Sequence, residues 1–126
     1  SGSDYGAQLL EKQKARFTYG LSESQFSRYV HEAMARRGVD SVSGLLSRLE
    51  GRLDNVVYRA GFVKTRRAAR QLVSHGHVQV NGRRMNVPSY LIAKGDIISI
   101  RPESRTSPLF TGYRAPIQHG GYHPVL

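Results

Sequence analysis

The chain has 126 residues, of which 19 are Lys or Arg and nine are Asp or Glu, giving a formal net charge of +10 at pH 7. A positive excess of this size is typical of proteins that bind a polyanion, either nucleic acid or an anionic membrane surface. The absence of Cys excludes disulfides and thiolate metal sites, and the apolar runs are too short to span a membrane.

The first third of the chain predicts helices. It begins SGSDYGAQLL, with neither an initiator Met nor a basic stretch followed by an apolar one, so we expect no secretory signal and a missing N-terminal part. A basic helix is predicted over residues 7–17. A second helix is predicted from Ser22, because Ser22 and Gln25 have the spacing of a capping box. A third helix follows, with Ser41 or Ser43 as its N-cap.

Two short helices are predicted next. In RLDNVVYRAG, apolar residues recur at the spacing of one helix face, and Gly61 ends the pattern. Thr65 is the expected N-cap of the following segment, TRRAARQLVSHG, which ends at Gly76. The two segments together predict a pair of helices joined by a short turn.

After Gly76 the pattern changes to strands. HVQV alternates, Asn81-Gly82 is typical of a type I′ hairpin turn, and RRMNV forms the returning strand. IISIR predicts a closing strand. We therefore expect an α+β fold in which the two short helices cover one face of a small antiparallel sheet.

The chain beyond Arg105 has no periodic pattern and contains three of the five prolines. We expect an extended tail there, ordered only where it lies against a partner. The predicted organisation is a helical subdomain at residues 1–50, a compact α+β domain at 51–105 and an extended tail at 106–126.

The basic residues are concentrated in one stretch. Between Lys64 and Asn86 there are six Lys or Arg residues and no acid. Arg66 and Arg70 are four apart on the predicted helix, so their like charges repel as neighbours on one face. An Arg guanidinium donates parallel hydrogen bonds to a phosphate, which would relieve this repulsion. The stretch therefore predicts a surface on which guanidinium groups project outward to bind phosphates.

Neighbouring segments extend this predicted surface. Asn55 and Arg59 lie four apart, off the apolar face of the preceding helix. On the hairpin, His77, Gln79 and Asn81 alternate with valines and should share the outer face of their strand. One helix and one hairpin would then read the shape and phosphate positions of a nucleic acid more than its bases. Charge alone does not distinguish RNA from DNA.

Other chemistry has weaker support. His75-Gly76-His77 brings two imidazoles together, but no third metal ligand is near in sequence, so we predict no metal. Asp54 could be a general base, yet an acid between Arg52 and Arg59 is more often a salt-bridge partner. No motif indicates nucleophilic catalysis. The sequence predicts no catalytic residue and no cofactor.

Two long blocks of sequence resemble a known family. RLDNVVYRAGFVKTRRAARQLVSHGHVQVNGRRMNVPSYLIAKGDIISIR closely resembles the RNA-binding domain of small-subunit ribosomal protein S-four, of the universal uS-four family. SDYGAQLLEKQKARFTYGLSESQFSRYVHEA resembles the segment that precedes this domain in the ribosomal protein. The resemblance covers residues 3 to about 105. From the resemblance we expect that the family's N-terminal segment, which carries zinc-binding cysteines in some members, is missing here and that the tail after Arg105 is atypical.

The resemblance implies a structural, non-enzymatic constituent of the small ribosomal subunit in the cytoplasm. Family members bind a junction in small-subunit (16S-type) rRNA early in assembly, and many bacterial members repress their own messenger. They neighbour ribosomal protein S-five and help to line the channel through which mRNA enters. The domain also occurs in pseudouridine synthases, bacterial tyrosyl-tRNA synthetases and a heat-shock protein. The alternatives are therefore the RNA-binding end of a pseudouridine synthase and a stand-alone RNA-binding repressor or stress protein.

The resemblance and the charge pattern together predict the RNA contacts, with no membrane involved. The expected contact residues are Lys12, Lys14, Arg16, Arg52, Asn55, Arg59, Lys64, Thr65, Arg66, Arg67, Arg70, Gln71, His75, His77, Asn81, Arg83 and Arg84.

Overall fold

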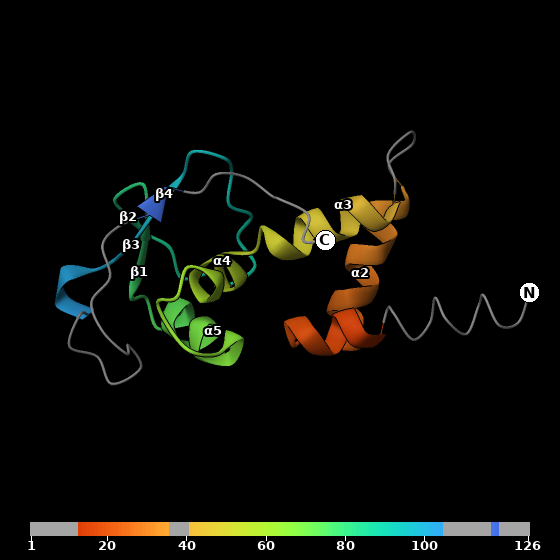
Figure 1. The fold of residues 1–126 in the computed structure, drawn as a ribbon, viewed down its shortest axis with the longest axis horizontal. Helices are drawn as coiled ribbons and strands as arrows, with labels where there is room; N and C mark the ends of the chain where they lie inside the picture. The colour runs from red at the N-terminus through yellow and green to blue at the C-terminus, as the bar shows by residue number, and fades with distance from the viewer. Residues whose placement is uncertain (1–12, 36–40, 105–116, 119–126) are drawn as a thin grey trace, which may run out of the picture. The chain divides into compact units, whose positions relative to one another are not determined.

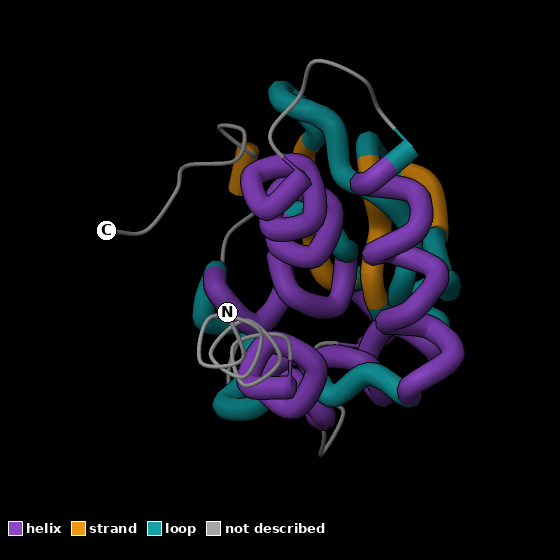
Figure 2. Tube along the Cα trace, turned by 90° about the vertical axis from the view of Figure 1, so that its right-hand side faces the viewer, coloured by secondary structure: helices purple, strands orange, loops and turns teal. Residues whose placement is uncertain are grey.

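The computed structural model describes residues 13–35, 41–104 and 117–118 (Figure 1). The chain divides into two units, Ser1–Leu45 and Leu46–Leu126. Most of the described chain is helix and loop, and the strands are short, as the tube in Figure 2 shows.

The N-terminal unit contains a helix over residues 13–19 and α2 (Glu23–Met34). The predicted capping box at the start of α2 is confirmed. The Gln25 N–H donates to Ser22 Oγ at 3.3 Å, and the Ser22 N–H donates to Gln25 Oε1 at 3.4 Å. The prediction that the first helix ends at residue 17 was wrong, because helical geometry continues through residue 19. Residues 7–12 of the predicted helix lie outside the described residues.

Three helices precede the sheet of the second unit: α3 (Ser41–Glu50), α4 (Leu53–Arg59) and α5 (Arg66–Ser74). Gly51 separates α3 from α4, and its backbone lies close to the Leu91 side chain. A Cβ at Gly51 would lie 2.7 Å from Leu91 Cδ1. Thr65 caps α5 as predicted, with its Oγ1 accepting the Ala68 N–H at 3.0 Å.

Four short strands form one antiparallel sheet in the order β2-β1-β3-β4. Their bounds are β1 (Val78–Val80), β2 (Arg83–Arg84), β3 (Ile97–Ile100) and β4 (Ile117–Gln118). A short 3₁₀ helix, η1 (Pro102–Ser104), follows β3.

Two details of the sheet test the sequence prediction. Asn81 and Gly82 have φ of 53° and 78°, so the predicted type I′ turn between β1 and β2 is confirmed. The sequence predicted an extended tail without naming a strand in it, and Ile117 and Gln118 pair with Ile98 and Ile97 of β3. An edge strand offers unpaired N–H and C=O groups, and β4 covers the edge of β3 at Ile97 and Ile98.

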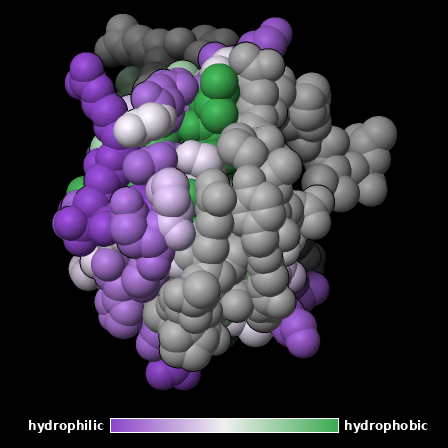
Figure 3. Space-filling model, turned by 90° about the vertical axis from the view of Figure 1, so that its left-hand side faces the viewer, coloured by the Kyte–Doolittle hydropathy of each residue, from purple (hydrophilic) through white to green (hydrophobic). Residues whose placement is uncertain are grey.

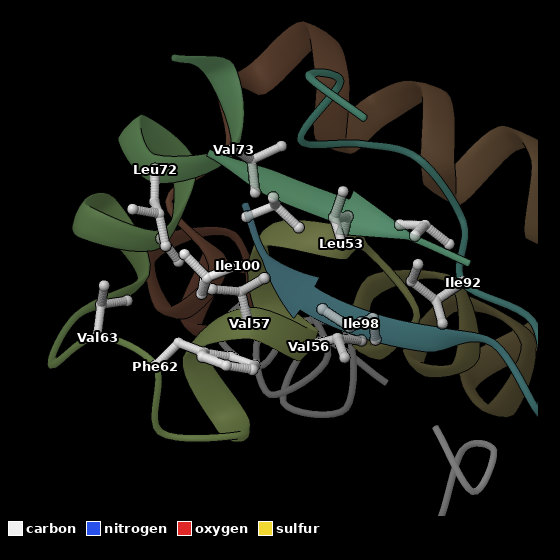
Figure 4. Close-up of a cluster of buried hydrophobic side chains, with 13 residues drawn as sticks. Leu53, Val56, Val57, Phe62, Val63, Leu72, Val73, Ile92, Ile98 and Ile100 are labelled. Carbon is white, nitrogen blue, oxygen red and sulfur yellow. The ribbon is translucent and has the colours of Figure 1, made fainter. Parts of the chain in front are cut away.

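The core lies between α4, α5 and one face of the sheet, as predicted (Figure 4). Alternation along the strands turns Val78, Val80, Ile98 and Ile100 toward the helices, and all four are buried. Burying an aliphatic side chain of this kind contributes about 1.5–3 kcal/mol. The remaining core side chains come from the two helices and the adjoining loops: Leu53, Val56, Val57, Phe62, Val63, Ala69, Leu72, Val73 and Ile92.

Candidate nucleic-acid interface

A buried carboxylate lies beneath the predicted basic surface. Asp54 is in the first turn of α4 and only 3 % exposed. Arg52 donates from Nε to Asp54 Oδ1 at 3.0 Å and from Nη2 to Oδ2 at 2.9 Å, so the pair is bidentate. Arg70 of α5 donates from Nε to Asp54 Oδ2 at 3.4 Å. The interpretation of Asp54 as a salt-bridge partner is confirmed, and its carboxylate ties α5 to the start of α4.

Asn55 forms a second bridge between the helices. Its Nδ2 donates to the Glu50 carbonyl at 3.0 Å and to Glu50 Oε2 at 2.8 Å. Its Oδ1 accepts from Arg66 Nε at 3.0 Å. The Arg66 guanidinium also lies 4.5 Å from the centroid of the Tyr58 ring, within cation–π range. Glu50 Oε1 in turn lies 3.1 Å from Arg59 Nη2.

Because of these contacts, several predicted contact residues are less exposed than the sequence suggests. Arg52 and Asn55 are 3 % and 2 % exposed, so protein covers two side chains that the sequence places on the surface. Arg66 and Arg70 are only partly exposed, since each has a nitrogen bonded to an internal acceptor. The bonds of Arg66 to Asn55 and of Arg70 to Asp54 could not be recognised from spacing, because they join residues 11 and 16 positions apart in the sequence.

Other predicted contact residues lie on the outside of the same helices. Lys64, Arg67 and Gln71 are exposed, and so is Thr65, whose hydroxyl is occupied in capping α5. We define the helix-layer group as the five cations of α4, α5 and their connection: Arg59, Lys64, Arg66, Arg67 and Arg70.

The hairpin residues belong to the other layer of the unit. Because Val78 and Val80 face the core, His77 and Gln79 lie on the opposite, outer face of the sheet. Arg84 is the cross-strand partner of Gln79 and shares this outer face, whereas Arg83 is the partner of the core-facing Val80. The structure therefore divides the predicted single surface between the helix layer and the outer sheet face.

Figure 3 views the molecule from the side of Figure 1 on which β1, β2 and β3 lie. Hydrophilic residues gather over part of this face.

Asn81 has a structural task at the end of the hairpin. Its Oδ1 accepts the Ile97 N–H at 2.9 Å, and its Nδ2 donates to Asp96 Oδ1 at 3.0 Å. These bonds connect the β1–β2 turn to the start of β3. The short polar side chain and the positive φ suit Asn at this position.

Two histidines follow α5. His77 Nδ1 lies 2.6 Å from Ser104 Oγ, which connects β1 to η1, and the His75 ring centroid is 6.2 Å away from that of His77. Partial burial lowers the pKa of His77, and the nearby His75, Arg101 and Arg84 lower it further. Arg101 was not among the predicted contact residues. It lies beside His77 because the two residues are opposite each other where β1 pairs with β3.

The remaining predicted contacts lie in the N-terminal unit. Lys14 is exposed on the first helix. Arg16 donates from Nε to Gln13 Oε1 at 3.2 Å, and its guanidinium lies 4.3 Å from the Phe17 ring centroid. Lys12 lies outside the described residues.

Within residues 13–35, 41–104 and 117–118, no group of three or more His, Asp or Glu side chains could hold a metal ion. None of the helices described in these ranges is long and apolar enough to cross a membrane.

Two family models match consecutive parts of the chain. Residues 1–50 match the Ribosomal protein S4/S9 N-terminal domain, and residues 51–98 match the S4 domain.

Curated relatives are similar over both parts. The chain is 59 % identical over 109 residues to "Small ribosomal subunit protein uS4" of Persephonella marina, covering 86 % of this chain and 53 % of the relative. It is 56 % identical over 108 residues to the protein of the same name from Chloroflexus aurantiacus, covering 86 % and 52 %. The chain therefore spans about half the length of the curated relatives it matches.

Proposed function

Because the chain belongs to the uS4 family of ribosomal proteins, we propose that it is a constituent of the small ribosomal subunit and binds small-subunit rRNA. The proposed role is structural, without catalysis, and its place is the cytoplasmic ribosome. We also propose the domain organisation expected from the sequence, with a helical subdomain at residues 1–50 and an RNA-binding domain at 51–105.

The internal anchoring of the helix-layer group is the observation that supports RNA binding best. Arg59, Arg66 and Arg70 each have a nitrogen bonded to Glu50, Asn55 or Asp54. A guanidinium has several N–H donors, so one anchored nitrogen can fix its direction while the group still meets a phosphate. Preorganised side chains lose less conformational entropy on binding. This arrangement suits recognition of a phosphate backbone with a defined shape.

Arg52 and Asn55 then act as positioning residues, because protein covers both side chains. The direct contacts that we propose are the members of the helix-layer group, together with Gln71 and the exposed residues of the hairpin. Contact with mRNA near its channel, a role in subunit assembly and a boundary with ribosomal protein S-five are finer parts of the same proposal.

The proposal is tested by binding to a transcript of the small-subunit rRNA 5′ domain. Lys64→Glu with Arg67→Glu reverses two exposed charges near the start of α5 that the structure does not show bonded to internal acids. We expect at least a tenfold loss of affinity, because two phosphate contacts become repulsive. Arg66 and Arg70 are less suitable, since their replacement would also disturb Asn55 and Asp54.

Lys94→Glu is the matched control, because Lys94 is an exposed cation in the turn before β3, outside the helix-layer group. The control should bind nearly as tightly as the original chain. Equal loss in the control and the double variant would mean that net charge alone drives binding. Failure of the unaltered chain to sediment with small subunits on a density gradient would contradict the proposed function.

A further inference from the structure

The outer face of the sheet carries a row of polar side chains from three strands. Gln79 of β1 has two cross-strand partners, Arg84 of β2 and Ser99 of β3. His77 lies two residues before Gln79, and its carbonyl accepts the Arg101 N–H at 2.8 Å. This bond continues the pairing of β1 with β3 and places His77 opposite Arg101. Cross-strand partners project from the same face of a sheet. We define these five residues as the outer-face group.

Two guanidinium groups of this set reach the same turn from opposite sides of β1. The Arg84 guanidinium lies against Gly76, in the space that a side chain at that position would occupy. Arg101 donates from Nη1 to the Gly76 carbonyl at 3.4 Å. Both cations are close enough to His77 to disfavour its protonation. The turn after α5 is therefore a centre of positive charge.

Within the described part of the chain, one acidic side chain forms an ion pair with this arginine pair. Arg101 Nε lies 2.9 Å from Glu103 Oε2 in η1. The Glu103 side chain is 67 % exposed, so water screens this ion pair strongly. Arg84 is exposed as well. The pair with Glu103 consequently offsets only part of the positive charge of Arg84 and Arg101.

We propose that the outer-face group is a second contact for the RNA backbone, in which Arg84 and Arg101 bind phosphates. His77, Gln79 and Ser99 then offer hydrogen bonds to phosphate or ribose oxygens beside them. This inference rests on the proposed function, which already counts Arg84 among the exposed hairpin residues, and it extends that contact to the face shared with Gln79, Ser99 and Arg101. It assigns an RNA contact to Arg101, which neither the charge pattern nor the family resemblance indicated.

A purely structural role for the same cations gives a different expectation. Arg84 and Arg101 lie at the C-terminal end of α5, where positive charge interacts favourably with the helix dipole. If that were their whole role, neutralising them would lower stability and leave the salt dependence of RNA binding unchanged. Counterion release makes the salt dependence a count of phosphate contacts.

The test is the affinity of Arg101→Gln and Arg84→Gln for the rRNA 5′-domain transcript at several salt concentrations. Each variant should bind about 5- to 10-fold more weakly at low salt, because a charge-assisted hydrogen bond is lost. The slope of log K against log[salt] should become shallower by about 0.7 to 0.9 for each phosphate contact removed.

Two further variants act as controls. Lys94→Gln removes an exposed cation outside the outer-face group and should leave the slope nearly unchanged. Glu103→Gln removes the acid paired with Arg101 and should increase affinity, because the guanidinium becomes available to phosphate. Urea unfolding of every variant shows which substitutions affect the fold.

The outcomes separate the two proposals. Unchanged slopes in both arginine variants, beside a steep slope for the original chain, would overturn the outer-face contact and leave the proposed function standing. A flat slope for the original chain would overturn the proposed function itself. If an arginine variant fails to fold, Gln79→Glu replaces it: the added carboxylate should weaken RNA binding, and unchanged binding would refute the outer-face contact.

Discussion

The helix layer and the outer sheet face use arginine in different ways. In the helix layer, Arg66 and Arg70 are bonded to Asn55 and Asp54, and both of these partners are buried. On the outer sheet face, Arg84 lies over a glycine and Arg101 is bonded to an exposed acid and a backbone carbonyl. Arginines of one basic domain are thus held by buried acceptors in the helix layer, and by backbone groups and an exposed acid on the outer sheet face.

The largest expected effect comes from removing the buried acceptor. Asp54→Ala should destabilise the chain by about 3–5 kcal/mol, because it removes the buried carboxylate that is paired with the buried Arg52 guanidinium. Glu103→Ala is the matched control, since it removes the acid of an exposed ion pair and should cost at most about 1 kcal/mol. Urea unfolding measures both, and equal costs would show that the buried carboxylate is not special.

Substitution of two glycines tests how the backbone conformation beside the sheet positions Arg84. Gly76 and Gly82 have φ of +82° and +78°, so Ala at either position should cost about 1–2 kcal/mol. Nothing lies within 4 Å of a Cβ at Gly82, whereas the Arg84 guanidinium occupies that space at Gly76.

Gly76→Ala should therefore displace Arg84 and weaken RNA binding, while Gly82→Ala should affect stability alone. Titration with the rRNA transcript, combined with thermal unfolding, distinguishes the two. Equal affinities for these variants would indicate that the position of Arg84 over Gly76 does not matter for binding.

The smallest expected effect is the pH dependence contributed by His77. Its pKa is lowered in the folded chain, chiefly by burial, so the unfolded chain binds protons more readily. Stability should be retained above about pH 6.5 and decline as the pH falls below that value. His77→Asn should flatten this part of the stability profile, which is measured by urea unfolding between pH 5 and 8. An unchanged profile would mean that other groups cause the decline.

Local signals made much of the fold predictable. The capping box at Ser22 and Gln25, the N-cap at Thr65 and the Asn81-Gly82 turn each depend on residues close in sequence. Periodicity placed α4, α5 and the first three strands for the same reason. The pairing of Ile117 with Ile98 joins distant segments through backbone groups, so β4 could not be predicted.

The candidate interface was predictable in composition and less so in geometry. Counting charges located the basic stretch, but the burial of Arg52 and Asn55 depends on bonds to Asp54 and Glu50 made only in the folded chain. The inclusion of Arg101 follows from strand register opposite His77. The number of cations was thus visible in the sequence, whereas their division between two layers required the structure.

The most direct measurement is the salt dependence of binding between the unaltered chain and the rRNA 5′-domain transcript. If the two layers together neutralise about six to eight phosphates, log K should fall with log[salt] with a slope of about −4 to −7. A slope near zero would contradict electrostatic capture of the RNA backbone by these cations.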